Sequence, residues 1–323
     1  MKPGYAVRAP RRSELTEILD AVNAAGRAGD PTAAAQTVDE YLRVWSRLDT
    51  GRDAWIVTGP GGEVAGYGHV TAETGEGRVH ADAYTHPGHE GAGIGTRLLE
   101  LAETRAAELA TTAGQDLSLY NYVYLGGDSE RLLRARGYRC TRVHQRMSIA
   151  LDGPLAAPVW ADGVTLRPCT GTAEDLRAVH ACVEDAFGDR WGGEPRPYDV
   201  WADDLLYDGF DPSLWLLAER AGRIAGAALC RFRDVRGELA GEVGQLAVGR
   251  EDRRLGIGRS LLLSSFALFA ERGAPSVGLD VDSESLTGAH LLYARAGMTV
   301  TVSIGRFERE VSGATADGAR TRG

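Results

Sequence analysis

Hydrophobic and polar residues follow two periods along this chain, and the periods predict a repeated order of strands and helices. Over 257–272, Leu261, Leu262, Phe266 and Phe269 recur at helical spacing and define one apolar face that would pack on a sheet. Short apolar runs bounded by turn residues indicate strands. In the first half the predicted strands are 5–8, 54–58, 64–71, 78–85, 117–122 and 138–150. A first predicted helix begins near Ser13, and a second helical region follows it and ends near Leu48. Two further helices are predicted at 94–110 and 129–136.

Four short segments of the first half recur in the second at offsets between 159 and 163. The echoed pairs are 7–10 with 166–168, 62–66 with 222–226, 93–99 with 256–262, and 132–137 with 292–297. The chain is therefore predicted to contain two copies of one domain. We expect a first copy at 1–150, a linker rich in turn residues at 151–163, a second copy at 164–310 and a disordered tail at 311–323.

Composition narrows the classes of function. Of 323 residues, 43% are hydrophobic and 25% charged, which is typical of a globular protein long enough for two domains. The 36 basic and 45 acidic residues give a formal charge of -9 without a sustained basic run, so nucleic acid and membrane are not expected partners. No segment indicates a signal peptide or a membrane span, and we expect a cytoplasmic protein. The four cysteines form no C-x-x-C pair, and His86 with His89 lacks a third ligand, so no metal site is expected.

A glycine turn offers the clearest chemistry. Gly256 and Gly258 directly follow a short strand and open the helix at 257–272. The first N–H groups of a helix lack intrahelical partners and lie at the positive end of its dipole, so backbone alone could hold a diphosphate there. Arg253, Arg254 and Arg259 add charge. A Rossmann dinucleotide site would need a third glycine two residues on, and Ser260 stands there instead. The remaining alternative is an ordinary tight turn between strand and helix.

The pattern Arg253-x-x-Gly256-x-Gly258 resembles the acyl-CoA signature of the GNAT acetyltransferase superfamily. The element order also resembles the GNAT fold, an α/β fold with a mixed sheet, found here twice in tandem. The resemblance implies acetyl-CoA as co-substrate and no metal. It places the pantetheine arm on the backbone of Leu246, Ala247 and Val248. It places the diphosphate on Arg253, Arg254, Leu255, Gly256, Ile257, Gly258, Arg259 and Ser260, with Ser285 where the family has an asparagine.

The same resemblance implies two catalytic side chains. An alkylammonium of pKa near 10 must lose a proton before it attacks a thioester, and Glu242 matches the position of the family's general base. Tyr293 matches the tyrosine that protonates the departing thiolate. Without the resemblance, Glu242 would be interpreted as a solvated residue at a strand edge, and Tyr293 as a packing residue of a helix.

The two copies do not carry the same residues. Aligning the glycines places Glu90 against Arg253, Val79 against Glu242, and Leu133 against Tyr293. The first copy is therefore predicted to lack both base and acid and to be non-catalytic. Its glycine turn still offers backbone donors for a second CoA site, formed by Gly91, Gly93, Ile94, Gly95 and Thr96.

The expected acceptor is the primary amine of a small molecule. Asp189, Trp191 and Tyr198 are candidate acceptor contacts, because their segment mixes charges, aromatics and turn residues in a predicted loop. Asp280 is a fourth candidate, because it lies at the end of the fifth strand of the second copy. A protein or peptide acceptor, and a non-enzymatic acyl-CoA-binding module, remain as alternatives. The two copies could pack as a pseudo-dimer, so we expect a monomer.

Overall fold

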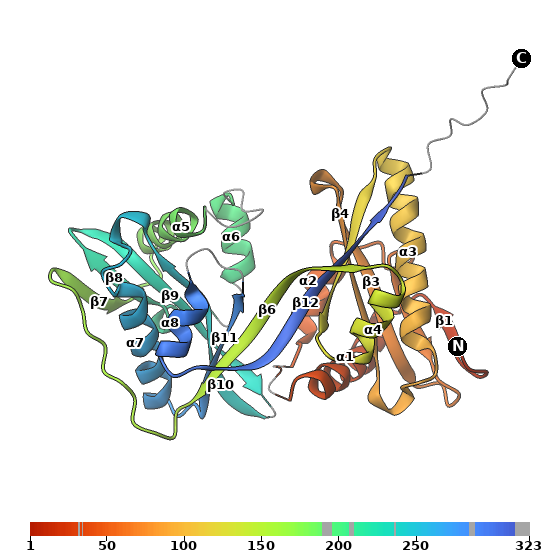
Figure 1. The fold of residues 1–323 in the computed structure, drawn as a ribbon, viewed down its shortest axis with the longest axis horizontal. Coiled ribbons are helices and arrows are strands. Elements are labelled where there is room, and N and C mark those ends of the chain that lie inside the picture. The colour runs from red at the N-terminus through yellow and green to blue at the C-terminus, as the bar shows by residue number, and fades with distance from the viewer. Residues whose placement is uncertain are drawn as a thin grey trace, which may run out of the picture. The chain divides into compact units, whose positions relative to one another are not determined.

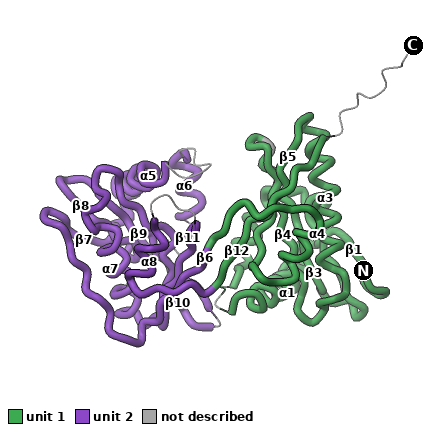
Figure 2. Tube along the Cα trace, in the orientation of Figure 1, with its two compact units in different colours: residues 1–144, 302–323 green, residues 145–301 purple. Residues whose placement is uncertain are grey.

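The computed structural model describes residues 1–31, 33, 35–188, 196–206, 210–235, 237–283 and 288–313. The chain divides into two compact units, drawn in different colours in Figure 2. Unit 1 comprises residues 1–144 together with the chain from residue 302 onward, and unit 2 comprises residues 145–301. The predicted α/β fold with a mixed sheet is confirmed in both units.

Unit 1 combines a twisted sheet with helices, labelled in Figure 1. Its strands are β1 (Ala6–Arg8), β2 (Ala54–Thr58), β3 (Val64–Glu73), β4 (Arg78–Thr85), β5 (Leu117–Tyr124), and parts of β6 (Arg139–Ala150) and β12 (Thr299–Val311). Its helices are α1 (Leu15–Gly29), α2 (Val38–Trp45), α3 (Ile94–Ala113) and α4 (Asp128–Ala135). The pairs β1–β2, β2–β3, β3–β4 and β5–β12 are antiparallel, and the pair β4–β5 is parallel.

Unit 2 repeats this arrangement. Its strands are β7 (Val164–Pro168), β8 (Leu216–Arg220), β9 (Arg223–Val235), β10 (Glu238–Val248) and β11 (Ser276–Asp282). Its helices are α5 (Ala173–Phe187), α6 (Tyr198–Leu205), α7 (Ile257–Glu271) and α8 (Ala289–Arg295). The pair β10–β11 is parallel, like β4–β5 in unit 1.

Each unit is completed by a strand from the other half of the sequence. In unit 1, β12 pairs with β5 along Ile304–Val311. In unit 2, β6 is the strand next to β11. The sequence predicts that 138–150 belongs to the sheet of the first copy and that the last strand, up to residue 310, belongs to the second. In the structure, β12 instead pairs with a strand of unit 1, and β6 lies next to a strand of unit 2. The bounds 1–150 and 164–310 of the two homologous copies stay a prediction. The compact units have different bounds.

Two helices lie close to their sheets because glycines on the strands leave room. In unit 1, a Cβ at Gly66 would lie 2.6 Å from Ile94 of α3. In unit 2, a Cβ at Gly241 would lie 2.5 Å from the Phe269 ring of α7. Residues alternate between the two faces of a strand, so Glu242 is on the face opposite α7.

A bulge in β10 changes the alignment of the two copies. Arg231 of β9 lies five positions after Gly226. Their partners on β10, Glu242 and Val248, are six positions apart, because the register shifts between Val243 and Gln245. From Gly66 to Thr71 of β3, the partners on β4 run from Thr85 to His80, five positions, without a shift. Because Gly66 and Gly226 are echoed residues, the residue of unit 1 equivalent to Glu242 is His80, not Val79.

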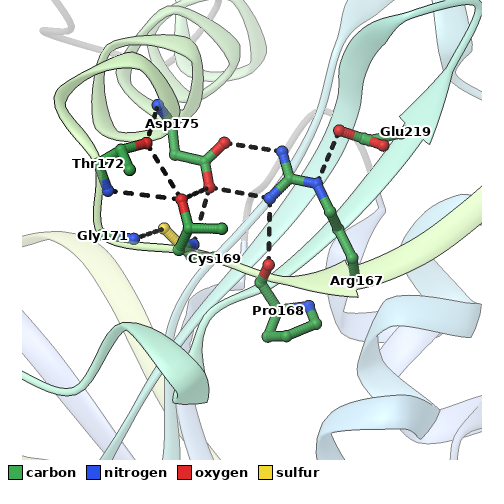
Figure 3. A network of polar contacts seen from close by, with 8 residues as sticks. Arg167, Pro168, Cys169, Gly171, Thr172, Asp175 and Glu219 are labelled. Carbon is green, nitrogen blue, oxygen red and sulfur yellow. Dashed lines mark hydrogen bonds and ion pairs between the residues drawn. The ribbon is translucent and has the colours of Figure 1, made fainter.

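A polar network fastens the first helix of unit 2 to its sheet, as Figure 3 shows. Arg167 of β7 donates to both oxygens of Asp175 on α5, at 2.7 and 2.8 Å, and to Glu219 of β8 at 2.8 Å. Asp175 also accepts from the backbone N–H and the hydroxyl of Thr170. The hydrogen bonds from Arg167, then those from Thr170, hold the pKa of Asp175 well below its ordinary value.

Candidate functional site

The strands β10 and β11 of unit 2 pair only at their beginnings. Their paired positions are Gly241 with Val277 and Glu242 with Gly278. Farther along β10, the segment 246–248 pairs with β9 on its other side. The β11 side of this segment lies beyond the paired part, so an extended pantetheine arm could pair with it as an added strand. The bulge precedes this segment and brings Gly244 out of the ladder.

The turn after β10 leads into the N-terminus of α7. Arg254 and Gly256 both have positive φ, 66° and 79°, which reverses the chain before the helix. The first helical hydrogen bond runs from Ser260 N to Gly256 O at 3.0 Å. The N–H groups of the residues between them precede that bond, at the positive end of a 15-residue helix. The turn therefore suits an anion such as a diphosphate.

Asp252 holds this turn in place. Its side chain is fully buried and accepts from Arg220 at 3.0 Å and from Arg223. Arg253 ties the same turn to α5, since its guanidinium donates to Ala186 O at 2.9 Å. The turn is thus rigidly supported from two strands and a helix, although Arg253 is engaged within the protein.

Three predicted parts of the site converge at Gly258. A Cβ at this glycine would lie 3.4 Å from Val248, at the end of β10, and 3.5 Å from Leu292 of α8. The strand end, the helix N-terminus and α8 are therefore neighbours. Tyr293 follows Leu292 directly in α8.

Tyr293 is a buried phenol without a hydrogen-bond partner in the described part of the chain. Its side chain is 9% exposed, and burial raises the pKa of the phenol to about 12. The hydroxyl therefore stays protonated at neutral pH and is available as a proton donor.

Glu242 lies between two arginines of the neighbouring strand. Arg231 donates to both of its oxygens, at 3.2 Å each, and Arg233 lies 3.3 Å away. Sequence reasoning missed these arginines. The sequence did contain a signal for them: Arg231 and Arg233 are two residues apart on a strand predicted to form a hairpin with the strand of Glu242. Counting back from the turn of that hairpin places both arginines on the same face as Glu242.

Other predicted contacts are used within the protein. The Ser260 hydroxyl donates to Val159 O, and its N–H closes the first turn of α7, so both of its donors are engaged within the unit. Asp280 accepts two hydrogen bonds from Arg146, at 2.9 and 3.0 Å. The Tyr198 ring packs under the Arg177 guanidinium, 4.4 Å from its centroid. Asp189, Trp191 and Ser285 lie outside the described residues.

The sequence model of the acetyltransferase (GNAT) family matches residues 17–119 and 177–298, once in each half. The chain belongs to the GNAT family.

Two mycothiol acetyltransferases are similar to this GNAT chain over most of its length. The protein from Thermobispora bispora is 31% identical over 74% of this chain and 78% of its own. The protein from Thermomonospora curvata is 31% identical over 78% of this chain and 81% of its own. Relatives of this kind show that the chain is an acetyl-transfer enzyme, an acyltransferase.

Solved structures show the same tandem fold. A GCN5-related N-acetyltransferase from Sphaerobacter thermophilus superposes with a TM-score of 0.77 and 32% identity, covering 98% of both chains. A tandem GNAT protein from the clavulanic acid biosynthesis pathway gives a TM-score of 0.71 at 18% identity, over 96% of this chain and all of its own, which speaks to the fold alone. No described helix is long and apolar enough to cross a membrane, and the described residues hold no metal-binding cluster of His, Cys, Asp or Glu.

Unit 1 differs from the candidate site of unit 2 at several corresponding places. The side-chain amide of Asn121 donates to Ala81 O at 2.7 Å, where β4 and β5 begin to separate. The N–H of Lys2 donates to Ala92 O at 2.9 Å, so the start of the chain lies against the loop that includes Gly91 to Thr96. Leu133, buried, stands at the position of Tyr293. The Asn121 and Lys2 contacts belong to unit 1, and the second CoA site at Gly91 to Thr96 stays a prediction.

Proposed function

We propose that unit 2 transfers the acetyl group of acetyl-CoA to the primary amine of a small molecule. The observation that carries this proposal is the convergence at Gly258 of the unpaired end of β10, the N-terminus of α7, and α8 with its buried phenol. Segment 246–248 would hold the pantetheine arm, and the turn at 253–259 the diphosphate. The second sequence copy is then the catalytic one, and the first its non-catalytic partner.

The chemistry needs one proton removed and one supplied. The amine nitrogen forms a bond to the thioester carbon, and the carbon–sulfur bond breaks. Glu242 would take the proton of the ammonium, directly or through water, while its two arginines fix the orientation of the carboxylate. Tyr293, protonated at neutral pH, would donate to the departing thiolate. Direct transfer requires both substrates bound together.

The acceptor is proposed from the relatives. Several are named mycothiol acetyltransferases, so a cysteinyl amino-sugar is the first amine to test, followed by other amino-sugars and polyamines. No observation on the described residues favours a protein acceptor.

Thiol release from acetyl-CoA tests the assignment. We expect Glu242→Gln and Tyr293→Phe each to lower kcat/KM for the responsive amine by about 100-fold or more, because each removes a proton-transfer group. A matched control should retain activity: Glu238→Gln, which changes an exposed carboxylate on the same strand. Wild-type turnover in both active-site variants would reject these roles.

A further inference from the structure

The face of unit 1 that corresponds to the Glu242 face carries a cluster of histidine, aspartate and tyrosine. The register of β4 places His80 at the position of Glu242, and Asp82 lies two residues on, on the same face. Next to them, Tyr120 of β5 is the register partner of His80, and His69 of β3 is the partner of Asp82. This face was not predicted as a site, because the alignment of glycines placed Val79 there.

Asp82 carries a charge that its neighbours do not neutralise by hydrogen bonds. Its carboxylate lies 3.5 Å from His80 Nε2 and 3.8 Å from His69 Nε2, beyond ordinary hydrogen-bond length. His69 is 4% exposed, and burial lowers the pKa of its imidazole, which therefore stays neutral at pH 7. His69 Nδ1 and His80 Nε2 are themselves buried without a hydrogen-bond partner.

The other charges of this face are paired with one another. Arg78 lies 3.3 Å from Glu73, and Arg306 lies 2.7 Å from Glu308. The Arg306 guanidinium also covers the Tyr120 ring, 4.1 Å from its centroid. Among the described residues, Asp82 therefore faces no arginine or lysine, and its only potentially cationic neighbours there are the two histidines.

Aromatic rings pack against His80, and the neighbouring Asp82 carboxylate stays partly accessible. His80 stacks on Tyr120 with centroids 4.8 Å apart and meets the edge of Tyr122 at 5.9 Å. The side chains of His80 and Asp82 are each 24% exposed, and Tyr122 is 41% exposed. A partly exposed carboxylate close to aromatic rings is suited to an alkylammonium group, which the charge attracts and the ring faces can contact.

We propose that unit 1 binds a small primary amine at Asp82 and His80, and that it does so without acetyl-CoA. The ammonium group would donate to the partly exposed Asp82 carboxylate, next to His80, and its carbon skeleton would lie against the exposed Tyr122. In unit 1 the Asn121 amide donates to Ala81 O and the Lys2 N–H to Ala92 O, contacts for which unit 2 shows no counterpart among its described residues. This inference is independent of the activity proposed for unit 2.

Imidazole nitrogen NMR on the full-length ¹⁵N-labelled protein tests this site. Cyclohexylamine is the probe, and cyclohexanol is its neutral analogue of similar shape. The signals of His69 and His80, assigned with single His→Gln variants, should shift saturably with the amine and not with the alcohol. Asp82→Asn should weaken this binding by about 10-fold or more, since it removes a charged hydrogen-bond acceptor.

Two control variants separate this proposal from that for unit 2. Glu76→Gln removes an exposed carboxylate that pairs with Arg78 and should leave the shifts unchanged, as should Glu242→Gln in unit 2. Acetyl transfer, followed as thiol release, should survive Asp82→Asn if that variant melts at the wild-type temperature. The proposal is overturned if the two histidines show no saturable shift, if cyclohexanol shifts them equally, or if Asp82→Asn binds the amine as wild type does.

Discussion

Arg254 adopts a backbone conformation that an arginine avoids. Its φ is 66°, in the left-handed region, and its side chain is exposed. The equivalent residue of unit 1 is Gly91, with a φ of 68°. Unit 2 therefore carries a strained arginine where a glycine would fit freely, in the turn proposed to hold the diphosphate. Strain kept at such a place is consistent with a role for the guanidinium.

Arg254→Gly should separate stability from binding. We expect this variant to raise the free energy of unfolding of unit 2 by up to about 1 kcal/mol, because glycine removes the left-handed strain. The same change should weaken acetyl-CoA binding, because a charge on the diphosphate is lost. Urea unfolding and isothermal titration calorimetry measure the two effects, and Arg272→Gly, on the same unit but away from the turn, is the control. Unchanged acetyl-CoA affinity would remove Arg254 from the proposed site.

At the scale of elements, irregular strands decide which residue stands where. The bulge in β10 adds one residue to that strand. The structural equivalent of Glu242 in unit 1 is therefore His80, whereas aligning the glycines of the sequence gives Val79. The position of a bulge is hard to predict from an alternating pattern, because a single inserted residue leaves the pattern on each side of it intact. The strand limits themselves were predictable: 54–58 and 78–85 match β2 and β4 at both ends.

The network of Asp175 joins β7, β8 and α5 and should make stability depend on pH. The folded-state pKa of Asp175 lies below its ordinary value of 3.8, so its contribution is complete above that value and is lost as pH falls through the folded pKa. Asp175→Asn should lower the free energy of unfolding by about 2–3 kcal/mol at neutral pH. Urea unfolding from pH 7 to pH 2 should show this difference constant down to about pH 4 and shrinking below it. A difference that grows toward acid pH would contradict the assignment.

At the scale of the whole molecule, each unit depends on a strand from the other half of the sequence. Phe307 of β12 is fully buried in the core of unit 1, and Met147 of β6 is buried in the core of unit 2. The sequence repeat assigns each of these residues to the opposite copy. Neither half of the sequence therefore contains a complete unit.

Two core truncations should expose this exchange. Phe307→Ala should destabilise unit 1 by about 3–5 kcal/mol, and Met147→Ala should destabilise unit 2 by about 2–5 kcal/mol, because each leaves a cavity. Hydrogen exchange would then show lost protection in β5 for the first variant and in β11 for the second. The opposite pattern, with β11 losing protection in Phe307→Ala, would mean that the strands stay in their own copies.

The sequence by itself determined the tandem repeat, the order of elements, the GNAT resemblance, and the glycine turn at 256–258, because these depend on local periodicity and on residues close together in the chain. The tertiary structure alone decided three features: the partners of β6 and β12, the arginines beside Glu242, and the place of His80. All three depend on pairing between strands, where a one-residue bulge or a change of partner moves side chains without altering the local pattern that the sequence displays.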